Sequence, residues 1–272
     1  MRSIGFISEK GGVAKTTTAL NVAAALGQAG ERVLVVDTDP QGNASHVLLR
    51  GEKPRRPTVL DVLTGDADAG QVIVPTHFKG VDLLPADASL ADATVVLAAE
   101  VGRERRLREA LVGAGGDYAF VLVDTAPTRS LLTTNVLNAV HELIVPFTPG
   151  LFGVLGLGQL QGDVAQVRRY LENKTLRIGG IVLTQVEKNN VHRELEDQLR
   201  AMFGTLVFAA KVPRSIKVEE AHARHESVLT YAPKSIGAVA YRAHAKEITS
   251  HGQREADRHD HPERDPAADH AA

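Results

Sequence analysis

Glycines, lysines and a hydroxyl group near the start of the chain have the types and spacing of a phosphate-binding loop. An apolar run at residues 4–7 leads into Gly11 and Gly12 and then into Lys15 and Thr16, where a helical pattern begins. Glycines let backbone N–H groups approach phosphate oxygens, and the amino end of a helix favours negative charge. A lysine balances charge on the β- and γ-phosphates, while a threonine hydroxyl can reach Mg²⁺. The segment therefore predicts a nucleoside triphosphate site.

Aspartates follow two further apolar runs. Asp37 and Asp39 come after residues 32–36, and Asp124 comes directly after residues 120–123. Open α/β sheets bind ligands beyond the carboxyl ends of their strands, so these carboxylates belong beside the loop. A carboxylate there can order an attacking water and help to organise Mg²⁺. A strand-ending aspartate also commonly caps a turn, but three motifs in order on suitable elements favour the nucleotide site.

Short β-branched runs alternate with helical patterns along most of the chain. This alternation predicts crossover connections and a mostly parallel sheet. The runs at 33–36 and 120–123 are apolar without alternation, as expected of central strands covered on both faces. We therefore expect an α/β fold with a doubly wound sheet flanked by helices. The expected strands are 3–8, 32–36, 81–84, 120–123, 143–145 and 178–183, and the expected helices are 15–28, 90–99, 104–112, 131–140, 155–171, 192–203 and 235–249.

The loop departs from the ordinary pattern G-x-x-x-x-G-K-[ST], because Glu9 and Ala14 stand where that pattern has glycine. Residues 10–16, KGGVAKT, instead resemble the deviant Walker A loop of the ParA/MinD family, K-G-G-x-x-K-[ST]. The family usually has glycine before the second lysine. A residue entering a helix can adopt right-handed backbone angles, where a methyl group is tolerated. We therefore expect nucleotide binding to survive at Ala14.

Other segments extend the resemblance over roughly residues 2–246. DTDPQGN at 37–43 resembles the family's switch I, and DTAP at 124–127 resembles its Walker B and switch II. TVLDVLTG, LLPADASLADA, LLTTNVLNAVHELIVPFTP and VPRSIKVEEA also look like ParA segments. The resemblance assigns Asp39 to the catalytic water, Asp37 to ordering of the metal site, and Asp124 to Mg²⁺ through water. It also implies that Lys10 reaches across a dimer interface to the partner's nucleotide.

The resemblance implies ATP and Mg²⁺ as cofactors and a defined set of site residues. In the family, the loops after residues 179–183 and at 212–214 frame the adenine. The implied catalytic residues are Lys10, Lys15 and Asp39. The implied nucleotide-binding residues are Lys10, Gly11, Gly12, Val13, Ala14, Lys15, Thr16, Thr17, Thr184, Gln185 and Pro213. The implied metal residues are Thr16, Asp37, Asp39 and Asp124.

The function implied by the resemblance is a nucleotide switch. ATP would close two protomers into a homodimer that binds double-stranded DNA without sequence preference, and a ParB-like adaptor would stimulate hydrolysis and release. Such binding depends on phosphate neutralisation and is sensitive to salt. Glutamates lie among the basic residues of the matching segments, so a solvated charged face is an equal alternative. The candidate DNA-binding residues are Lys188, Arg193, Arg214, Lys217, Arg224 and Lys234.

The composition excludes several classes of protein and site. The chain has no cysteine, which excludes disulfides, zinc–thiolate sites and the iron–sulfur cluster of the nitrogenase iron-protein branch. A formal net charge of −2 means that any nucleic-acid surface must be a local basic patch. The apolar run at 4–7 is too short for a signal peptide, and no segment approaches the roughly 20 apolar residues of a membrane span. Together with the resemblance, this indicates a cytoplasmic, nucleoid-associated protein.

The sequence leaves alternatives open. A ParA-like ATPase that positions a protein cargo would share the whole nucleotide site. A MinD-like cell-division regulator should end in a basic amphipathic helix, unlike PERDPAADHAA here, so we expect no membrane partner. Metabolic ligases of this fold would need a small-molecule pocket that the sequence does not identify. The short stretch before Ser3 leads us to expect no N-terminal helix-turn-helix.

We expect two parts in the chain: a ParA-like P-loop ATPase domain at 1–249 and a disordered, charged, His-rich tail at 250–272. From about Ser250 the only apolar residue type is alanine, which does not support a packed core. His251, His259, His261 and His270 lie in this tail. We expect them to be solvated, because nothing there defines a metal geometry.

Overall fold

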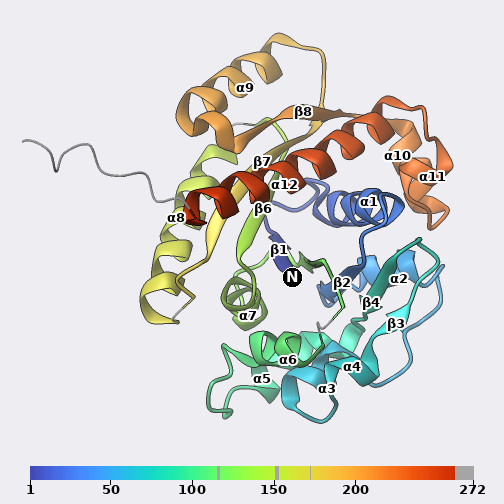
Figure 1. Cartoon of the computed structure of the whole chain (residues 1–272), viewed down its shortest axis with the longest axis vertical. Coiled ribbons are helices and arrows are strands. Elements are labelled where there is room, and N and C mark those ends of the chain that lie inside the picture. The colour runs from blue at the N-terminus through green and yellow to red at the C-terminus, as the bar shows by residue number, and fades with distance from the viewer. Residues whose placement is uncertain (115–116, 151–152, 172, 261–272) are drawn as a thin grey trace, which may run out of the picture.

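A twisted, largely parallel sheet runs through the centre of the molecule (Figure 1). The computed structural model describes residues 1–114, 117–150, 153–171 and 173–260. Within these residues the sheet has eight strands in the order β3-β4-β2-β5-β1-β6-β7-β8, and only the β3–β4 pair is antiparallel. The strands are β1 (Arg2–Phe6), β2 (Val33–Thr38), β3 (Val74–Pro75), β4 (Val81–Leu84), β5 (Phe120–Thr125), β6 (Glu142–Phe147), β7 (Arg177–Val186) and β8 (Val207–Pro213).

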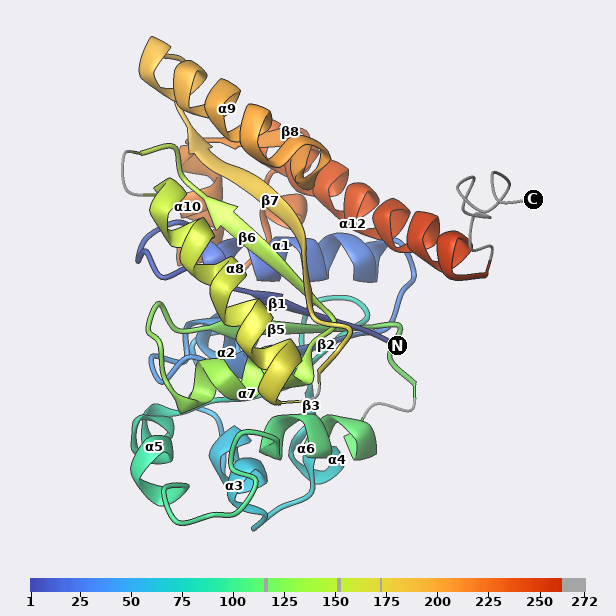
Figure 2. The ribbon, with the colours of Figure 1, turned by 90° about the vertical axis from the view of Figure 1, so that its left-hand side faces the viewer.

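Helices cover both faces of the sheet, which confirms the doubly wound fold (Figure 2). One buried apolar cluster lies under α3, α6, α7 and α8, and a second lies under α1, α2, α11 and α12. The larger helices are α1 (Lys15–Gln28), α6 (Arg106–Ala114), α7 (Leu131–Ala139), α8 (Gly153–Tyr170), α9 (Asn190–Phe203), α10 (Ile216–Ala223) and α12 (Ile236–Asp260). The shorter ones are α2 (Asn43–Leu48), α3 (Val59–Thr64), α4 (Ala69–Val72), α5 (Ala93–Val96), α11 (Val228–Tyr231) and the 3₁₀ turns η1 (Ala88–Asp92) and η2 (Gly204–Leu206).

The central strands agree with the sequence prediction, and the differences lie at the edges. Every residue of β2 and β5 is buried, as the unbroken apolar runs predict. The edge strands β3 and β8 were not predicted, because β3 has two residues and the sequence of β8, VFAAKVP, is interrupted by alanines and a lysine. The helix expected at 90–99 is instead the η1 turn followed by the single turn α5.

Helix α12 extends past its expected end at residue 249, so residues 250–260 are helical and not a disordered tail. Glutamine, arginine, glutamate and alanine in this stretch are good helix formers, and the first proline after the start of α12 is Pro262. The rest of the expected tail, 261–272, lies outside the described residues. In the described part of the chain, no helix has both the length and the apolar character to cross a membrane.

Candidate nucleotide-binding site

The carboxyl ends of three neighbouring strands bring the sequence motifs together. β5 lies between β1 and β2, with Asp124 in register with both Phe6 and Asp37. Side-chain hydroxyls tie the strand ends to one another. Thr38 Oγ1 donates to the Asp124 carbonyl oxygen at 2.6 Å, and Thr125 Oγ1 donates to the Phe6 carbonyl oxygen at 2.8 Å. The predicted acidic residues and the loop after β1 therefore share one edge of the sheet.

Lys15 is the first residue of α1 and is only 7% exposed. Burial lowers its pKa, while the carboxylates of Asp124 and Asp39 act in the opposite direction. A buried ammonium is costly unless charges of opposite sign surround it. The attraction of these two carboxylates partly offsets the cost of burying Lys15. Lys15 stands at the amino end of α1, where a phosphate group would be favoured. Thr16 and Thr17 follow it and are half-buried.

The backbone of Ala14 contradicts the expectation of right-handed angles. Ala14 precedes α1 with φ 62° and ψ 37°, in the left-handed region, and Gly12 has φ 73°. The chain therefore makes left-handed turns on either side of Val13 before it enters the helix. This conformation is less stable by about 1–2 kcal/mol for an L-residue with a side chain. Ala14 is therefore strained, and a glycine at this position would not be.

Asp37 is fully buried at the end of β2 and accepts three hydrogen bonds. The Asp39 N–H donates to Oδ1 at 3.1 Å, and the N–H and hydroxyl of Ser45 donate to Oδ2 at 2.8 and 2.7 Å. Burial raises the pKa of the Asp37 carboxyl to about 6, although these three hydrogen bonds act in the opposite direction. Asp37 thus connects the end of β2 to α2, the helix that follows the predicted switch segment.

Asp124 is also fully buried, and neither of its carboxylate oxygens has a hydrogen-bond partner of good geometry among the described residues. Burial and the nearby Asp37 raise its pKa well above the ordinary value, although Thr16 and Lys15 act in the opposite direction. Buried polar atoms are normally paired. Unpaired carboxylate oxygens beside a threonine hydroxyl fit the preference of hydrated Mg²⁺ for oxygen ligands.

Asp39 lies two residues beyond Asp37 at the mouth of the site. It is 7% exposed, and its Oδ1 accepts a hydrogen bond from the Gln41 N–H at 2.9 Å. This bond fixes the carboxylate within the tight turn after β2. Its second oxygen has no hydrogen bond to another described residue.

Two predicted base contacts lie against the phosphate loop itself. Thr184 Oγ1 donates to the Val13 carbonyl oxygen at 3.0 Å, and Gln185 Nε2 donates to the Gly12 carbonyl oxygen at 2.7 Å. Pro213 ends β8, in register with Val186. The structure therefore brings Thr184 and Gln185 to the loop, where they support its carbonyl groups.

Comparisons with known proteins agree with this arrangement. A family model described as an AAA domain matches residues 1–178. The chromosome partitioning protein ParA of Caulobacter vibrioides is 40% identical over 261 residues, 95% of this chain and 96% of that one. The chromosome-partitioning ATPase Soj of Thermus thermophilus is 40% identical over 93% of this chain and 97% of its own length. The chain belongs to the ParA family of P-loop ATPases.

A solved structure supports the cofactors of this ParA-family ATPase. Cobyrinic acid a,c-diamide synthase from Mycobacterium smegmatis, with bound ADP and magnesium, superposes with a TM-score of 0.80 at 33% identity. The match covers 94% of this chain and 96% of that one. The fold of this chain is therefore one that holds a magnesium–adenine nucleotide in that protein.

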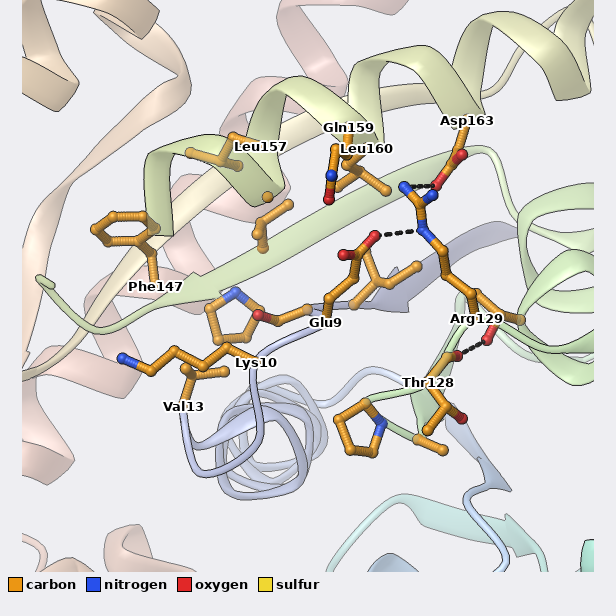
Figure 3. Close-up of a pocket in the computed structure, with 18 of the residues that line it drawn as sticks. Glu9, Lys10, Val13, Thr128, Arg129, Phe147, Leu157, Gln159, Leu160 and Asp163 are labelled. Carbon is orange, nitrogen blue, oxygen red and sulfur yellow. Dashed lines mark hydrogen bonds and ion pairs between the residues drawn. The ribbon is translucent and has the colours of Figure 1, made fainter. Parts of the chain in front are cut away.

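Lys10, the predicted signature lysine, lies on the rim of a cavity of about 470 Å³ between the phosphate loop and α8 (Figure 3). It is exposed, and its Nζ lies 3.3 Å from the position that a Cβ atom would occupy on Gly150. Sequence reasoning missed the charged network at this cavity. Arg129 donates to Glu9 at 2.5 Å and forms an ion pair with Asp163 at 2.9 Å (Figure 3). Arg129 lies two residues after the DTAP motif, which is the signal that sequence could have offered.

The candidate DNA-binding residues of this ParA-family chain are all exposed but do not form one uniform patch. Arg214 pairs with Glu187 at 3.3 Å, and Lys217 pairs with Glu220 at 2.7 Å. Lys188, Arg193 and Lys234 form no ion pair with another described residue, and the Arg224 guanidinium lies 5.5 Å from the centre of the Tyr231 ring. A face on which only some of the cations are paired with carboxylates is compatible with either DNA binding or a solvated surface.

Proposed function

We propose that this chain is a partition ATPase whose ATP-bound dimer binds DNA without sequence preference and leaves it after hydrolysis. The observation that carries the proposal is the cluster of three buried charges, Lys15, Asp37 and Asp124, at the edge where β1, β2 and β5 end. Buried charges cost stability. An arrangement that places a lysine and two aspartates together beside a glycine loop is explained by a phosphate ligand with its Mg²⁺. The whole-length similarity to chromosome-partitioning proteins supports DNA as the cargo.

In this proposal Lys15 binds the β- and γ-phosphates, and the amides of Gly11 to Thr17 surround them. Thr16 and Asp124 hold Mg²⁺, Asp124 through water, and Asp37 orders the surroundings by anchoring Ser45 on α2. Bound Mg²⁺ supplies charge neutralisation at the phosphate oxygens. The hydroxyl bridges at the strand ends keep these groups in one geometry, which positions ATP before reaction.

Asp39 orients the attacking water in this scheme. One of its oxygens is held by the Gln41 N–H, which leaves the other to accept a hydrogen bond from a water near the γ-phosphate. Because Asp39 sits on the segment that leads into α2, loss of the γ-phosphate removes a contact from the switch segment. That difference in contacts is what a nucleotide switch requires.

Lys10 supplies the dimer contact in this proposal. Its exposed side chain extends from the loop past Val13 (Figure 3), as a group would that contacts the nucleotide of a second protomer. A ParB-like adaptor then stimulates hydrolysis, and the protein acts in the cytoplasm at the nucleoid. The DNA contacts are Lys188, Arg193, Arg214, Lys217 and Arg224.

The test is binding to random-sequence duplex DNA with ATP, with ADP and without nucleotide, over a series of salt concentrations. We expect binding only with ATP, and weaker binding as salt increases. Lys10→Ala should bind ATP but fail to dimerise and to bind DNA, whereas Lys15→Ala should fail to bind ATP. Failure of the wild type to bind DNA in every nucleotide state would overturn the proposal, and would favour a protein cargo.

A further inference from the structure

A second cavity lies away from the phosphate loop, at the carboxyl end of α1. It measures about 550 Å³, and its walls come from α1, the segment after α2, the turn between β3 and β4, and the segment between α10 and α11. These elements lie on the same side of the molecule in Figure 1. None of the residues of the phosphate loop or of the aspartate motifs lines it. The cavity is therefore a feature that the nucleotide site does not explain.

The lining of this cavity is rich in cations. Arg50, Lys79 and Arg224 come from three different segments, and Glu226 is the one carboxylate among the lining residues. None of the three cations forms an ion pair with another described residue. Elsewhere on this surface cations do have partners, as Lys217 does in Glu220 at 2.7 Å. Three cations and one carboxylate give the lining a net positive charge. Like charges repel one another, and an anion bound there would reduce that repulsion.

Partly buried polar contacts hold the walls together. His77 bridges two of them, with Nδ1 3.0 Å from the Leu48 carbonyl oxygen and Nε2 2.7 Å from the His225 carbonyl oxygen. The ring of His225 packs edge-on against His46 of α2, with 4.8 Å between ring centres. Such contacts fix the positions of the cations' backbones before any ligand arrives, which lowers the cost of binding.

The carboxyl-terminal end of α1 forms one wall of the cavity through Ala24 and Gln28. A Cβ atom at Gly27 would collide with the Lys79 carbonyl oxygen, and one at Gly80 would lie 2.8 Å from the Glu31 carbonyl oxygen. Glycine at both positions therefore lets α1 contact the β3–β4 turn directly. Asn21 joins α1 to α11, because its Oδ1 accepts from the Val228 N–H at 2.8 Å.

A polar atom within this cluster also has no partner. His225 Nδ1 is buried and has no hydrogen bond to any described residue, although His225 lines the cavity. An unpaired buried polar atom costs free energy. Ser227 and Thr230 line the same wall, and their hydroxyl oxygens lie 3.1 Å apart. Cations, an imidazole and hydroxyls are the groups that surround phosphate oxygens in proteins.

We propose that this cavity binds a phosphate group, from a ligand other than the nucleotide in the phosphate loop. Arg50 and Lys79 supply the main charge, and Arg224 closes the third side. The group is either part of a small phosphorylated molecule or a phosphodiester of DNA, because both present the same oxygens. If the group is a DNA phosphodiester, the inference rests on the proposed function and adds Arg50 and Lys79 to the DNA contacts.

The test measures two probes on the full-length protein. Inorganic pyrophosphate is titrated by calorimetry with Mg–ADP at saturation, so that the phosphate loop is occupied. Random-sequence duplex DNA is titrated with ATP over a salt series. We expect the double variant Arg50→Ala, Lys79→Ala to weaken at least one probe by about tenfold or more, since hydrogen bonds to charged groups are strong. Lys53→Ala removes an exposed cation that does not line the cavity and should change neither.

Each outcome decides the proposal. Weaker pyrophosphate binding identifies a small-molecule phosphate site, and weaker DNA binding alone, with a lower salt dependence, identifies a DNA phosphate. Unchanged binding of both probes by the double variant, with thermal melting equal to wild type, overturns the proposal. A wild type that binds pyrophosphate but never DNA keeps the cavity and overturns the proposed function. Arg50→Lys should retain most of the affinity, because it preserves the charge.

Discussion

The nucleotide edge and the candidate DNA face both depend on charged side chains, but they are built in opposite ways. At the nucleotide edge Asp37 and Asp124 are buried near the ends of adjacent strands, and Lys15 is buried at the start of α1. On the DNA face the candidate cations are exposed, and Arg214 is paired with an acidic neighbour. A buried charge is tolerated only for a reason, whereas an exposed charge needs none.

This difference has a thermodynamic side. Burying charge at the nucleotide edge opposes folding, most of all at Asp124, whose carboxylate oxygens have no hydrogen-bond partner among the described residues. Substitutions there should therefore separate stability from activity. Charges on the DNA face cost little, so substitutions there should change binding and leave stability alone. The following predictions test that contrast, from the largest expected effect to the smallest.

Asp39→Ala should slow ATP hydrolysis by roughly 10²–10⁴-fold, the range for loss of a group that handles the proton of the nucleophile. ATP binding should remain, because Asp39 is not required to hold the phosphates. The variant should therefore persist as an ATP dimer, measured by size-exclusion chromatography and phosphate release. Elution equal to wild type, with both proteins saturated, would argue against the dimer mechanism.

Asp124→Asn should abolish Mg²⁺-dependent hydrolysis and yet stabilise the ligand-free protein at pH 7 by roughly 1–3 kcal/mol. The folded-state pKa of Asp124 is raised, so the native state binds a proton more tightly than the unfolded chain, and stability is lost as pH rises from about 4. The gain from asparagine should therefore shrink as pH falls towards 4. Urea unfolding at pH 7 and pH 4 measures it, and a loss of stability at pH 7 would contradict the cost assigned to this charge.

Ala14→Gly should raise the free energy of unfolding by about 0.5–1 kcal/mol, because glycine relieves the left-handed strain but adds freedom to the unfolded chain. The control is Ala25→Gly within α1, which should lower it by about 1 kcal/mol. Thermal and urea unfolding give both values. Equal losses for the two variants would mean that position 14 is not strained.

Lys188→Ala should weaken DNA binding several-fold and lower the slope of log affinity against log salt by about 1, the value for one lost phosphate contact. Arg214→Ala should have a smaller effect, because Glu187 already neutralises Arg214 in part. Neither should change the unfolding free energy by more than about 0.5 kcal/mol. Identical salt slopes for wild type and both variants would place the DNA contacts elsewhere.

The same contrast explains how far sequence could lead. The nucleotide edge was predictable because strand, loop and helix occur in order, and parallel strands must present their carboxyl ends at one edge. The left-handed angles of Ala14 were not predictable, because alanine rarely adopts them and the closure of the loop overrides its preference. The Arg129 network with Glu9 and Asp163 joins positions far apart in the chain, and local patterns carry no information about such contacts.

The elements that sequence missed are those with weak local signals. α2 and α3 have six residues each, too few to show a helical period. α10 has eight residues, of which only Ala221 is buried, and the apolar run of β8 is interrupted by two alanines and a lysine. Tertiary packing, not propensity, decides such segments. The DNA face is the hardest feature to predict from sequence, because exposed lysines and arginines occur on surfaces of every kind.

Because Gly27 contacts the β3–β4 turn closely, a glycine at this position is a sequence signature of the second cavity. A side chain at position 27 would push the turn that carries Lys79 away from α1, and the wall of the cavity would open. Relatives that keep glycine at positions 27 and 80 together with cations at 50 and 79 should therefore share the cavity. Relatives with a larger residue at 27 should lack it.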